Sequence, residues 1–280
     1  MIPNKRAHIY VAAGTDDGLK GKNNEDLFSV TAYHLSETDD TPVLFSILAD
    51  GIGGHESGEV AASIAVEMIS QAIAESDASQ PTAIMQAAMI QASKTIRAQA
   101  EKGKHKKGMG TTCVCAWVVD LDLYIASAGN SRAYLLRGKN LVQINKDHTW
   151  IQEAVDAGAL TPEQARTHPN ANIIQRHLGN RQGVDVDLRL FLTEDHSDDK
   201  PKENQGTELQ PGDRLLLCSD GLTDLVEDKD IYKIIYNFSI QESVQKLIDK
   251  ANEAGGKDNI TIIIIEIPGG KKRLTNPFIE

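Results

Sequence analysis

The sequence is poor in cysteine and lacks any spacing typical of a zinc site. Its three cysteines are Cys113 and Cys115, which alternate along one apolar run, and Cys218, which lies within another. Cysteines in such positions behave as small buried hydrophobic residues, and disulfides are rare in the cytosol. We therefore expect buried free thiols in a reducing cytosol, without a catalytic or zinc-binding role.

Basic residues and long apolar runs are also scarce. The 29 Lys and Arg residues are outnumbered by 40 Asp and Glu residues, giving a formal net charge of −11. General nucleic-acid binding requires basic patches, so we expect no nucleic-acid partner.

The first residues lead into no long apolar stretch. We therefore expect neither a signal peptide nor a membrane span, and we expect the protein to be cytoplasmic. No linker rich in Pro, Gly or Ser separates two cores. We expect one domain over residues 1–267 and a loosely held tail at 268–280.

What the sequence does contain is a set of carboxylates at the ends of apolar runs. Asp50 and Asp220 each end such a run and are each followed by glycine, whereas Asp258 and the pair Glu25 and Asp26 each precede one. If these strands share a core, their carboxylates can converge at one edge. Carboxylate oxygens and an unshielded glycine carbonyl suit a hard cation such as Mg²⁺ or Mn²⁺. A single Asp-Gly pair, however, predicts only a tight turn that caps a strand.

Six motifs together resemble the metal-dependent protein phosphatases, the PPM or type 2C family, and they occur in the family's order. They are Asn-Asn-Glu-Asp at 23–26, Ala-Asp-Gly-Ile-Gly-Gly-His at 49–55, Gly-Met-Gly-Thr-Thr at 108–112, Gly-Asn-Ser-Arg-Ala-Tyr at 129–134, Cys-Ser-Asp-Gly-Leu-Thr-Asp at 218–224 and Lys-Asp-Asn-Ile-Thr at 257–261. Each motif is weak alone, but the set covers nearly the whole chain. Residues 147–180 look like the flap of the bacterial members.

The resemblance implies a fold and a metal centre. The fold would be α+β, a four-layer α-β-β-α sandwich with two central antiparallel sheets. Two Mn²⁺ or Mg²⁺ ions would lie at one end of it. The resemblance assigns a role to each acidic position: Asp50 bridges both ions, Asp220 and Asp258 complete one, the Gly51 carbonyl binds the other, and Glu25 and Asp26 hold metal-bound waters.

The resemblance also implies an activity. The protein would be a serine/threonine phosphatase that hydrolyses phosphoserine and phosphothreonine with metal-activated water, opposing a bacterial Ser/Thr kinase. Its partners would be phosphorylated proteins, including such a kinase. His55 matches a histidine that can protonate the leaving hydroxyl, although a solvent-facing histidine at a helix start is an equal alternative. Two other functions stay open: a catalytically weak relative that binds phosphoproteins, and a phosphohydrolase of small molecules.

The chain departs from the family pattern at two positions. Gly21 stands where the family commonly has a phosphate-binding arginine, and the flanking Lys20 and Lys22 lack a bidentate guanidinium. Asn130 stands where bacterial relatives have a carboxylate that helps to hold a third metal, which makes a third ion doubtful here. Arg132, in the same motif, is expected to pair with an internal carboxylate.

Periodicity and turn residues predict the main helices and strands. Apolar residues at helical spacing predict helices at 57–75, 81–102, 150–157, 228–237 and 242–254. Short turns at 120–122 and 138–140 predict antiparallel pairs between the strands that flank them. Alternating residues also predict a strand at 188–192.

Overall fold

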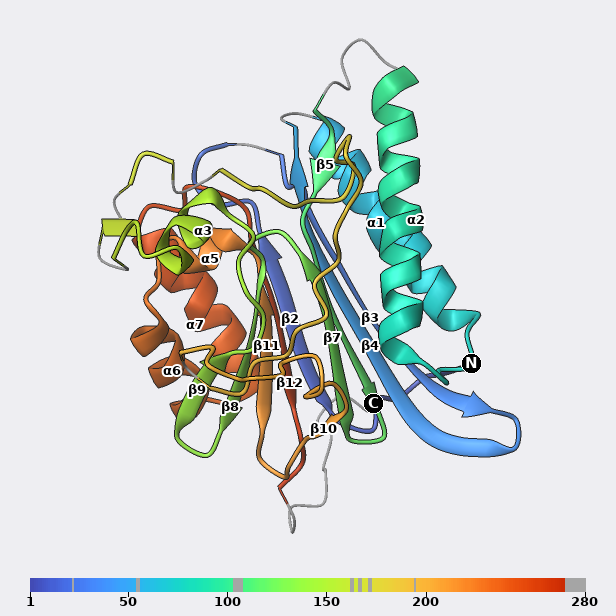
Figure 1. The fold of residues 1–280 in the computed structure, drawn as a ribbon. Helices are drawn as coiled ribbons and strands as arrows, with labels where there is room; N and C mark the ends of the chain where they lie inside the picture. The colour runs from blue at the N-terminus through green and yellow to red at the C-terminus, as the bar shows by residue number, and fades with distance from the viewer. Residues whose placement is uncertain are drawn as a thin grey trace.

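The chain forms two antiparallel sheets that lie face to face (Figure 1). The computed structural model describes residues 1–21, 23–53, 56–102, 108–161, 164–165, 168–170, 173–193 and 195–269. The first sheet runs, in order, β1 (Ile2–Asn4), β3 (Asp26–Ser36), β4 (Asp39–Ile52), β6 (Cys113–Val119), β7 (Asp122–Ala128) and β10 (Thr207–Glu208), and β5 (Gly110–Thr111) pairs with β4. The second runs β2 (Tyr10–Asp16), β12 (Ile260–Glu266), β11 (Arg214–Cys218), β8 (Arg132–Arg137) and β9 (Asn140–Gln143).

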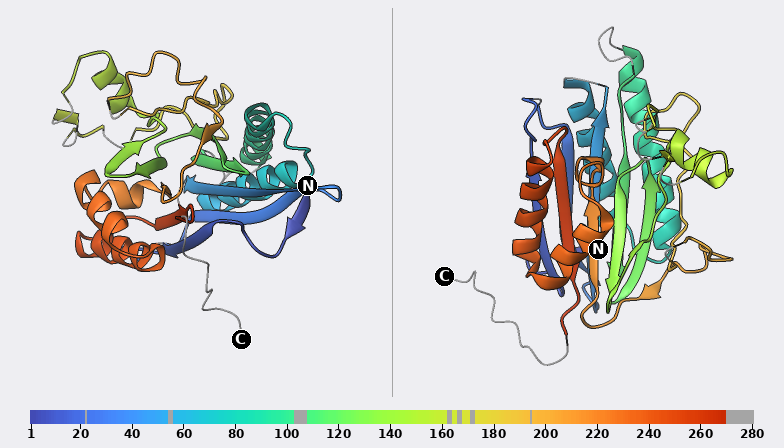
Figure 2. Two further views of the ribbon diagram at one scale, coloured as in Figure 1. Left: turned by 90° about the horizontal axis from the view of Figure 1, so that it is seen from below. Right: turned by 90° about the vertical axis from the view of Figure 1, so that its left-hand side faces the viewer.

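Helices cover the outer face of each sheet. On the first sheet lie α1 (Glu56–Ala74), against β3 and β4, and α2 (Pro81–Lys102), against α1 and β7. On the second lie α7 (Ile240–Glu253), against β2 and β12, and α6 (Asp228–Asn237), against α7. The short helices α3 (Trp150–Asp156) and α5 (Asp220–Thr223) complete the described set. Figure 2 shows the resulting four layers edge-on, and the expected α-β-β-α sandwich is confirmed.

The central strands are apolar on both faces because each face meets a different layer. In β4, Phe45 and Ile47 pack under α1 and α2, whereas Leu44 and Leu48 face the other sheet. Fully burying one such side chain contributes roughly 1.5–3 kcal/mol. Burial on both sides explains why these strands read as continuous apolar runs rather than as alternating ones.

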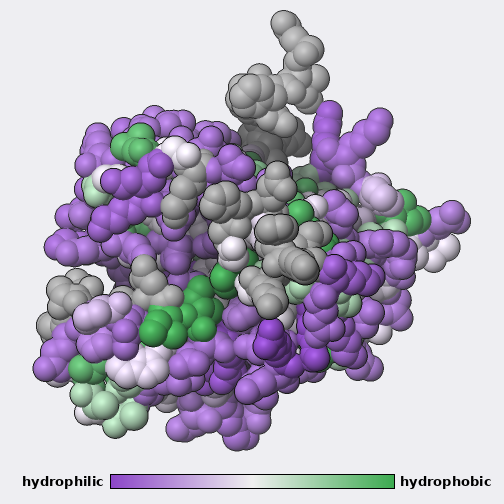
Figure 3. Space-filling model, turned by 90° about the horizontal axis from the view of Figure 1, so that it is seen from above, coloured by the Kyte–Doolittle hydropathy of each residue, from purple (hydrophilic) through white to green (hydrophobic). Residues whose placement is uncertain are grey.

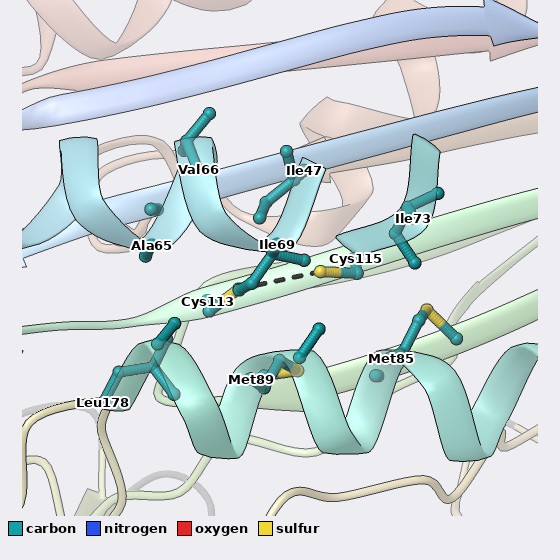
Figure 4. Close-up of a cluster of buried hydrophobic side chains, with 14 of the residues drawn as sticks. Ile47, Ala65, Val66, Ile69, Ile73, Met85, Met89, Cys113, Cys115 and Leu178 are labelled. Atoms are coloured by element: carbon teal, nitrogen blue, oxygen red, sulfur yellow. Dashed lines mark hydrogen bonds between the residues drawn. The ribbon is translucent and has the colours of Figure 1, made fainter. Parts of the chain in front are cut away.

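The three cysteines belong to these buried layers, as expected. All are free and buried. Cys113 and Cys115 share the face of β6 that packs under α1 and α2, and their sulfur atoms lie 3.6 Å apart (Figure 4). Burial raises the pKa of the Cys115 thiol well above its ordinary value, which suits a packing role.

The helix predictions agree closely with the structure, but the strand at 188–192 is wrong. Helices α2 and α6 have the predicted bounds, and the 120–122 and 138–140 turns join antiparallel pairs. Residues 188–192 join no sheet. The amide side chains of Asn204 and Gln205 instead donate to the carbonyls of Leu190 and Leu188, at 2.9 and 2.8 Å. These amides satisfy the backbone in place of a neighbouring strand.

In the described ranges, no helix combines the length and apolar character needed to cross a bilayer.

Candidate metal centre

Four acidic positions lie where strands of the two sheets end. In the first sheet, Asp26 begins β3 and lies directly opposite Asp50 in the β3–β4 register. In the second, Asp220 begins α5 just after β11, and Asp258 lies two residues before β12, which pairs with β11. The antiparallel pairing brings these chain ends to the same end of the sandwich, the upper end in Figure 1. Figure 3 looks onto that end, where hydrophilic residues predominate and apolar ones form small groups.

Asp50 is surrounded by negative charge. Burial raises the pKa of this carboxyl well above its ordinary value, and the charges of Asp26, Asp220 and Asp258 raise it further. Carboxylates this close repel one another, so the ionised form of the cluster is unfavourable unless a proton or a cation compensates it. The structure therefore brings together four of the five carboxylates that the sequence predicts to converge: Asp26, Asp50, Asp220 and Asp258.

Asp26 is the most buried member of the cluster. One oxygen, Oδ2, accepts a 2.8 Å hydrogen bond from the Ser219 hydroxyl, while Oδ1 is buried with no hydrogen-bond partner in the described part of the chain. Burial raises the pKa of Asp26 to about 7, although hydrogen bonds from Ser219 and Thr261 oppose the shift. An orphaned buried carboxylate oxygen costs roughly 1–3 kcal/mol, which a bound water or ion would relieve.

Asp220 is held by the asparagine that departs from the family pattern. Asn130 Nδ2 donates to Asp220 Oδ2 at 2.7 Å. Burial raises the pKa of the Asp220 carboxyl, and this hydrogen bond opposes the rise. The opposite amide orientation would place two oxygens against each other. Asn130 Oδ1 is buried and has no partner among the described residues. Asn130 thus offers Asp220 a donor, where an aspartate would offer another negative charge.

The glycines of this region are required by close backbone approach. A Cβ atom on Gly51 would lie 2.4 Å from the Gly58 carbonyl oxygen at the start of α1, and one on Gly58 would lie 2.3 Å from Glu25 Oε2. The Gly51 N–H also donates to the Glu25 carbonyl at 3.1 Å. On the other sheet, a Cβ on Gly221 would lie 1.9 Å from the Asn259 carbonyl oxygen. At both Asp-Gly pairs the residue after the aspartate must therefore be glycine, because a Cβ there would clash with the neighbouring backbone.

Thr111 and Thr112 hold the end of β4 in place, although the sequence alone assigned no individual role to either residue. The Thr112 N–H and the Thr111 hydroxyl both donate to the Asp50 carbonyl at 2.8 Å. The Asp50 N–H donates to Thr112 Oγ1 at 3.1 Å, and that oxygen lies 2.7 Å from Ser131 Oγ. The Ser131 contact ties β4 to the turn that carries Asn130. The only sequence signal for this support was the Gly-Met-Gly-Thr-Thr motif.

Residues of the predicted flap also reach this end of the molecule. Arg132 makes a bidentate pair with Asp147, with Nη2 and Oδ2 2.7 Å apart, which confirms its expected internal partner. Burial works against the charged form of Arg132, but the negative charge of Asp147 raises its pKa well above its ordinary value. Elsewhere in the flap, the His168 ring lies 5.0 Å from the Trp150 ring, centroid to centroid, so His168 has a packing contact.

Three further predicted positions are His55, Lys22 and Gly21. His55 and Lys22 lie outside the described residues. Gly21 has a φ of +66° and no heavy atom within 4 Å of the position a Cβ would take. A side chain at position 21 would therefore have space but would require a left-handed backbone, which costs roughly 1–2 kcal/mol for a residue with a Cβ.

The cluster suits hard cations by its chemistry. Its side-chain donors are carboxylate oxygens, with no thiolate or imidazole among those described, which is the ligand type of Mg²⁺ and Mn²⁺. In the described ranges, no three His, Cys, Asp or Glu side chains already surround one point closely enough to hold an ion. Raised carboxyl pKa values and the orphaned Asp26 Oδ1 nevertheless fit a compensating cation, and hard ions commonly complete their coordination with water and backbone carbonyls.

Comparison with known proteins gives one consistent family. The family model described as Protein phosphatase 2C matches residues 13–260. The serine/threonine protein phosphatase PstP of Mycobacterium tuberculosis is 34% identical over 271 residues, covering 97% of this chain and 47% of PstP, so the chain spans about half of that relative. The phosphatase stp of Listeria welshimeri is 35% identical over 262 residues, covering 90% of this chain and 93% of stp. A structure of the PstP catalytic domain with two manganese ions has a TM-score of 0.73 at 33% identity, covering 93% of this chain and 98% of that chain.

Proposed function

Because the chain belongs to the protein phosphatase 2C family, we propose that it is a serine/threonine phosphatase that hydrolyses phosphoserine and phosphothreonine at a centre of two Mn²⁺ or Mg²⁺ ions. The observation that carries the proposal is the convergence of Asp26, Asp50 and Asp220 from two sheets, with raised carboxyl pKa values. The names of the relatives support the substrate class, and the two manganese ions of the PstP domain support the metal.

We assign the metal ligands as the family resemblance implies them. Asp50 would contact both ions, Asp220 and Asp258 one of them, and the Gly51 carbonyl the other; Glu25 and Asp26 would orient water beside them. Two divalent ions bound in this way lower the pKa of a water molecule and offset the negative charge of a phosphoryl group.

The residues of the chain itself orient these ligands. Thr111 and Thr112 fix the backbone of Asp50, Ser219 holds one oxygen of Asp26, and Asn130 holds one oxygen of Asp220. Ligands fixed by their own hydrogen bonds lose little freedom when ions and substrate bind. The proposed general acid, His55, would donate a proton to the leaving seryl or threonyl oxygen.

The biological setting follows from the same family. We propose phosphorylated proteins as substrates, among them a Ser/Thr kinase that the phosphatase would oppose, and a cytoplasmic location. Residues 1–267 would form a single catalytic domain with residues 147–180 as its flap.

A substrate panel tests this proposal against the small-molecule alternative. Phosphoserine and phosphothreonine peptides, nucleotides and sugar phosphates are each offered to the protein with Mn²⁺, and kcat/KM is measured for each. We expect the phosphopeptides to be the best substrates. A higher kcat/KM for the nucleotides or sugar phosphates would contradict the proposal.

The Gly21 and Asn130 departures leave a second candidate function, a catalytically weak phosphoprotein-binding relative. The same panel separates it from the main proposal. Such a relative would bind the phosphopeptides tightly with little turnover at any Mn²⁺ concentration.

A further inference from the structure

A cavity of about 770 Å³ lies between the C-terminal end of α2 and residues 174–182, which we call the cavity segment and which begin within the predicted flap. Its lining includes Arg97 and Lys102 of α2, Met109, and His177 and Arg181 of the cavity segment. Figure 1 shows that this segment passes beside β5 and α2 at the end of the sandwich that carries the carboxylates. The cavity is outside the carboxylate cluster itself.

Hydrogen bonds between the two walls hold the cavity in shape. The Arg97 guanidinium donates through Nη1 to the Arg181 carbonyl at 2.7 Å. The Gly179 N–H donates to Ser93 Oγ on α2 at 2.9 Å. A Cβ on Gly179 would lie 2.7 Å from Ile96 Cγ2, so the segment lies directly against the helix. The walls are therefore fastened together before any ligand binds, which reduces the ordering that binding requires.

The same segment is bonded to β5, the short strand that pairs with the end of β4. Leu178 and Thr111 exchange two backbone hydrogen bonds, at 2.9 and 3.2 Å. Thr111 in turn pairs with Gly51 and donates its hydroxyl to the Asp50 carbonyl at 2.8 Å. One strand of backbone therefore separates the cavity segment from the end of β4. An extended chain advances about 3.3 Å per residue, so a peptide whose phosphorylated residue occupied the metal centre could reach the cavity within a few residues.

The lining of the cavity is cationic in a protein that is otherwise acidic. Arg97, Lys102 and Arg181 face a single carboxylate, Glu101, which Arg97 already binds at 3.0 Å. The helix end adds roughly half a negative charge, which still leaves a net positive lining. Neither Lys102 nor Arg181 forms an ion pair with any residue in the described ranges. The whole chain has a net charge of −11, so the positive charge of this lining is opposite in sign to the charge of the protein as a whole.

We propose that this cavity binds a second anionic group of the substrate, a carboxylate or a further phosphate on the same polypeptide, a few residues from the phosphate that is hydrolysed. The proposal rests on the proposed phosphatase function and adds a sequence preference to it. Acidic flanking residues would be attracted by Lys102 and Arg181, the cationic side chains of this lining that form no ion pair in the described ranges. The cavity therefore selects phosphoproteins whose phosphorylated segment is itself acidic.

The test compares matched phosphothreonine peptides. One peptide has neutral flanking residues, and the others carry a single glutamate, or a non-hydrolysable phosphonate, at successive positions on either side. We expect KM to fall about three- to tenfold when the anion occupies one or two particular positions, with kcat little changed. The glutamate and phosphonate peptides show which anion the cavity prefers.

Variants assign the effect to the cavity. The double variant Lys102→Gln with Arg181→Gln should abolish the preference while leaving the neutral peptide's kcat and KM unchanged. Glu101→Gln, which removes the opposing charge, should lower KM for the acidic peptide further. Lys139→Gln, an equally simple charge loss in the turn between β8 and β9, should leave the preference intact.

The outcomes distinguish this inference from the proposed function. Hydrolysis of all peptides with the same KM, or a preference that survives the double variant, overturns the cavity assignment and leaves the phosphatase proposal standing. Failure of the unmodified protein to hydrolyse any phosphopeptide with Mn²⁺ overturns both.

Discussion

Replacing Asp26 with asparagine should stabilise the metal-free protein at pH 8. The pKa of Asp26 is raised from 3.8 to about 7, mainly by burial. A raised carboxyl pKa means that the folded state holds the proton more tightly than the unfolded state. Stability is therefore greatest below about pH 4 and falls as the pH rises towards 7, after which this group adds no further change.

The size of the effect follows from the pKa shift. Raising the pKa of Asp26 from 3.8 to about 7 corresponds to about 4 kcal/mol, because each tenfold change in proton affinity is about 1.4 kcal/mol. The Asp26→Asn variant keeps an oxygen for the Ser219 hydroxyl but loses the charge-assisted character of that bond, which costs about 1 kcal/mol. We expect Asp26→Asn to raise the free energy of unfolding at pH 8 by about 2–3 kcal/mol. The neighbouring carboxylates titrate with Asp26, so the variant should flatten the pH dependence of stability without abolishing it.

The assay is urea unfolding of EDTA-treated protein, followed by tryptophan fluorescence, at several values between pH 5 and pH 8. Adding Mn²⁺ should reduce or reverse the advantage of the variant, because bound cations compensate the carboxylates of the unmodified protein. A variant that is no more stable at pH 8 and keeps the full pH slope would show that Asp26 is not held as an unfavourable buried charge.

Three further substitutions test individual features of the centre. Asn130→Asp would place a second carboxylate beside Asp220. We therefore expect a third Mn²⁺ peak in crystals of this variant soaked in Mn²⁺, and a hydrolysis rate that rises at high Mn²⁺ concentration. A third ion already bound through Asn130 in the unmodified protein would contradict this. Gly21→Arg should lower KM for a phosphopeptide. It should also lower the free energy of unfolding by about 1 kcal/mol, because the backbone at position 21 is left-handed. An unchanged or higher KM would show that another group binds the phosphate. Gly221→Ala should destabilise by about 2–4 kcal/mol in urea unfolding, because its Cβ would lie 1.9 Å from the Asn259 carbonyl oxygen; unchanged stability would show that the two chain ends are not packed as described.

The sequence predicted much of the fold because its elements are locally consistent. Pro81 begins α2, where its fixed φ suits the first turn of a helix, and apolar spacing carries the helix to Lys102. The apolar runs before Asp50 and Asp220 predicted strands that end in a carboxylate, since a run buried on both faces needs no alternation. The number of layers, however, came only from the family resemblance.

What the sequence could not predict depends on distant partners. Leu188, Leu190 and Leu192 alternate like a strand, yet two of their carbonyls are bonded by side chains 14 and 17 residues away. The hydrogen bond from Ser219 to Asp26 spans 193 positions. The Ser219–Asp26 bond exists only once the two sheets have packed together, and the amide contacts only once the loop has folded back, so local pattern carries no signal for either.

The central claim is that Asp50 is essential to a metal-dependent phosphatase centre. The most direct measurement is hydrolysis of a phosphothreonine peptide by the unmodified protein and by Asp50→Asn, each with Mn²⁺ and in excess EDTA. We predict turnover only for the unmodified protein with Mn²⁺, and a loss of several orders of magnitude in the variant, which should remain folded by circular dichroism. Full turnover in EDTA, or equal turnover by Asp50→Asn, would contradict the account.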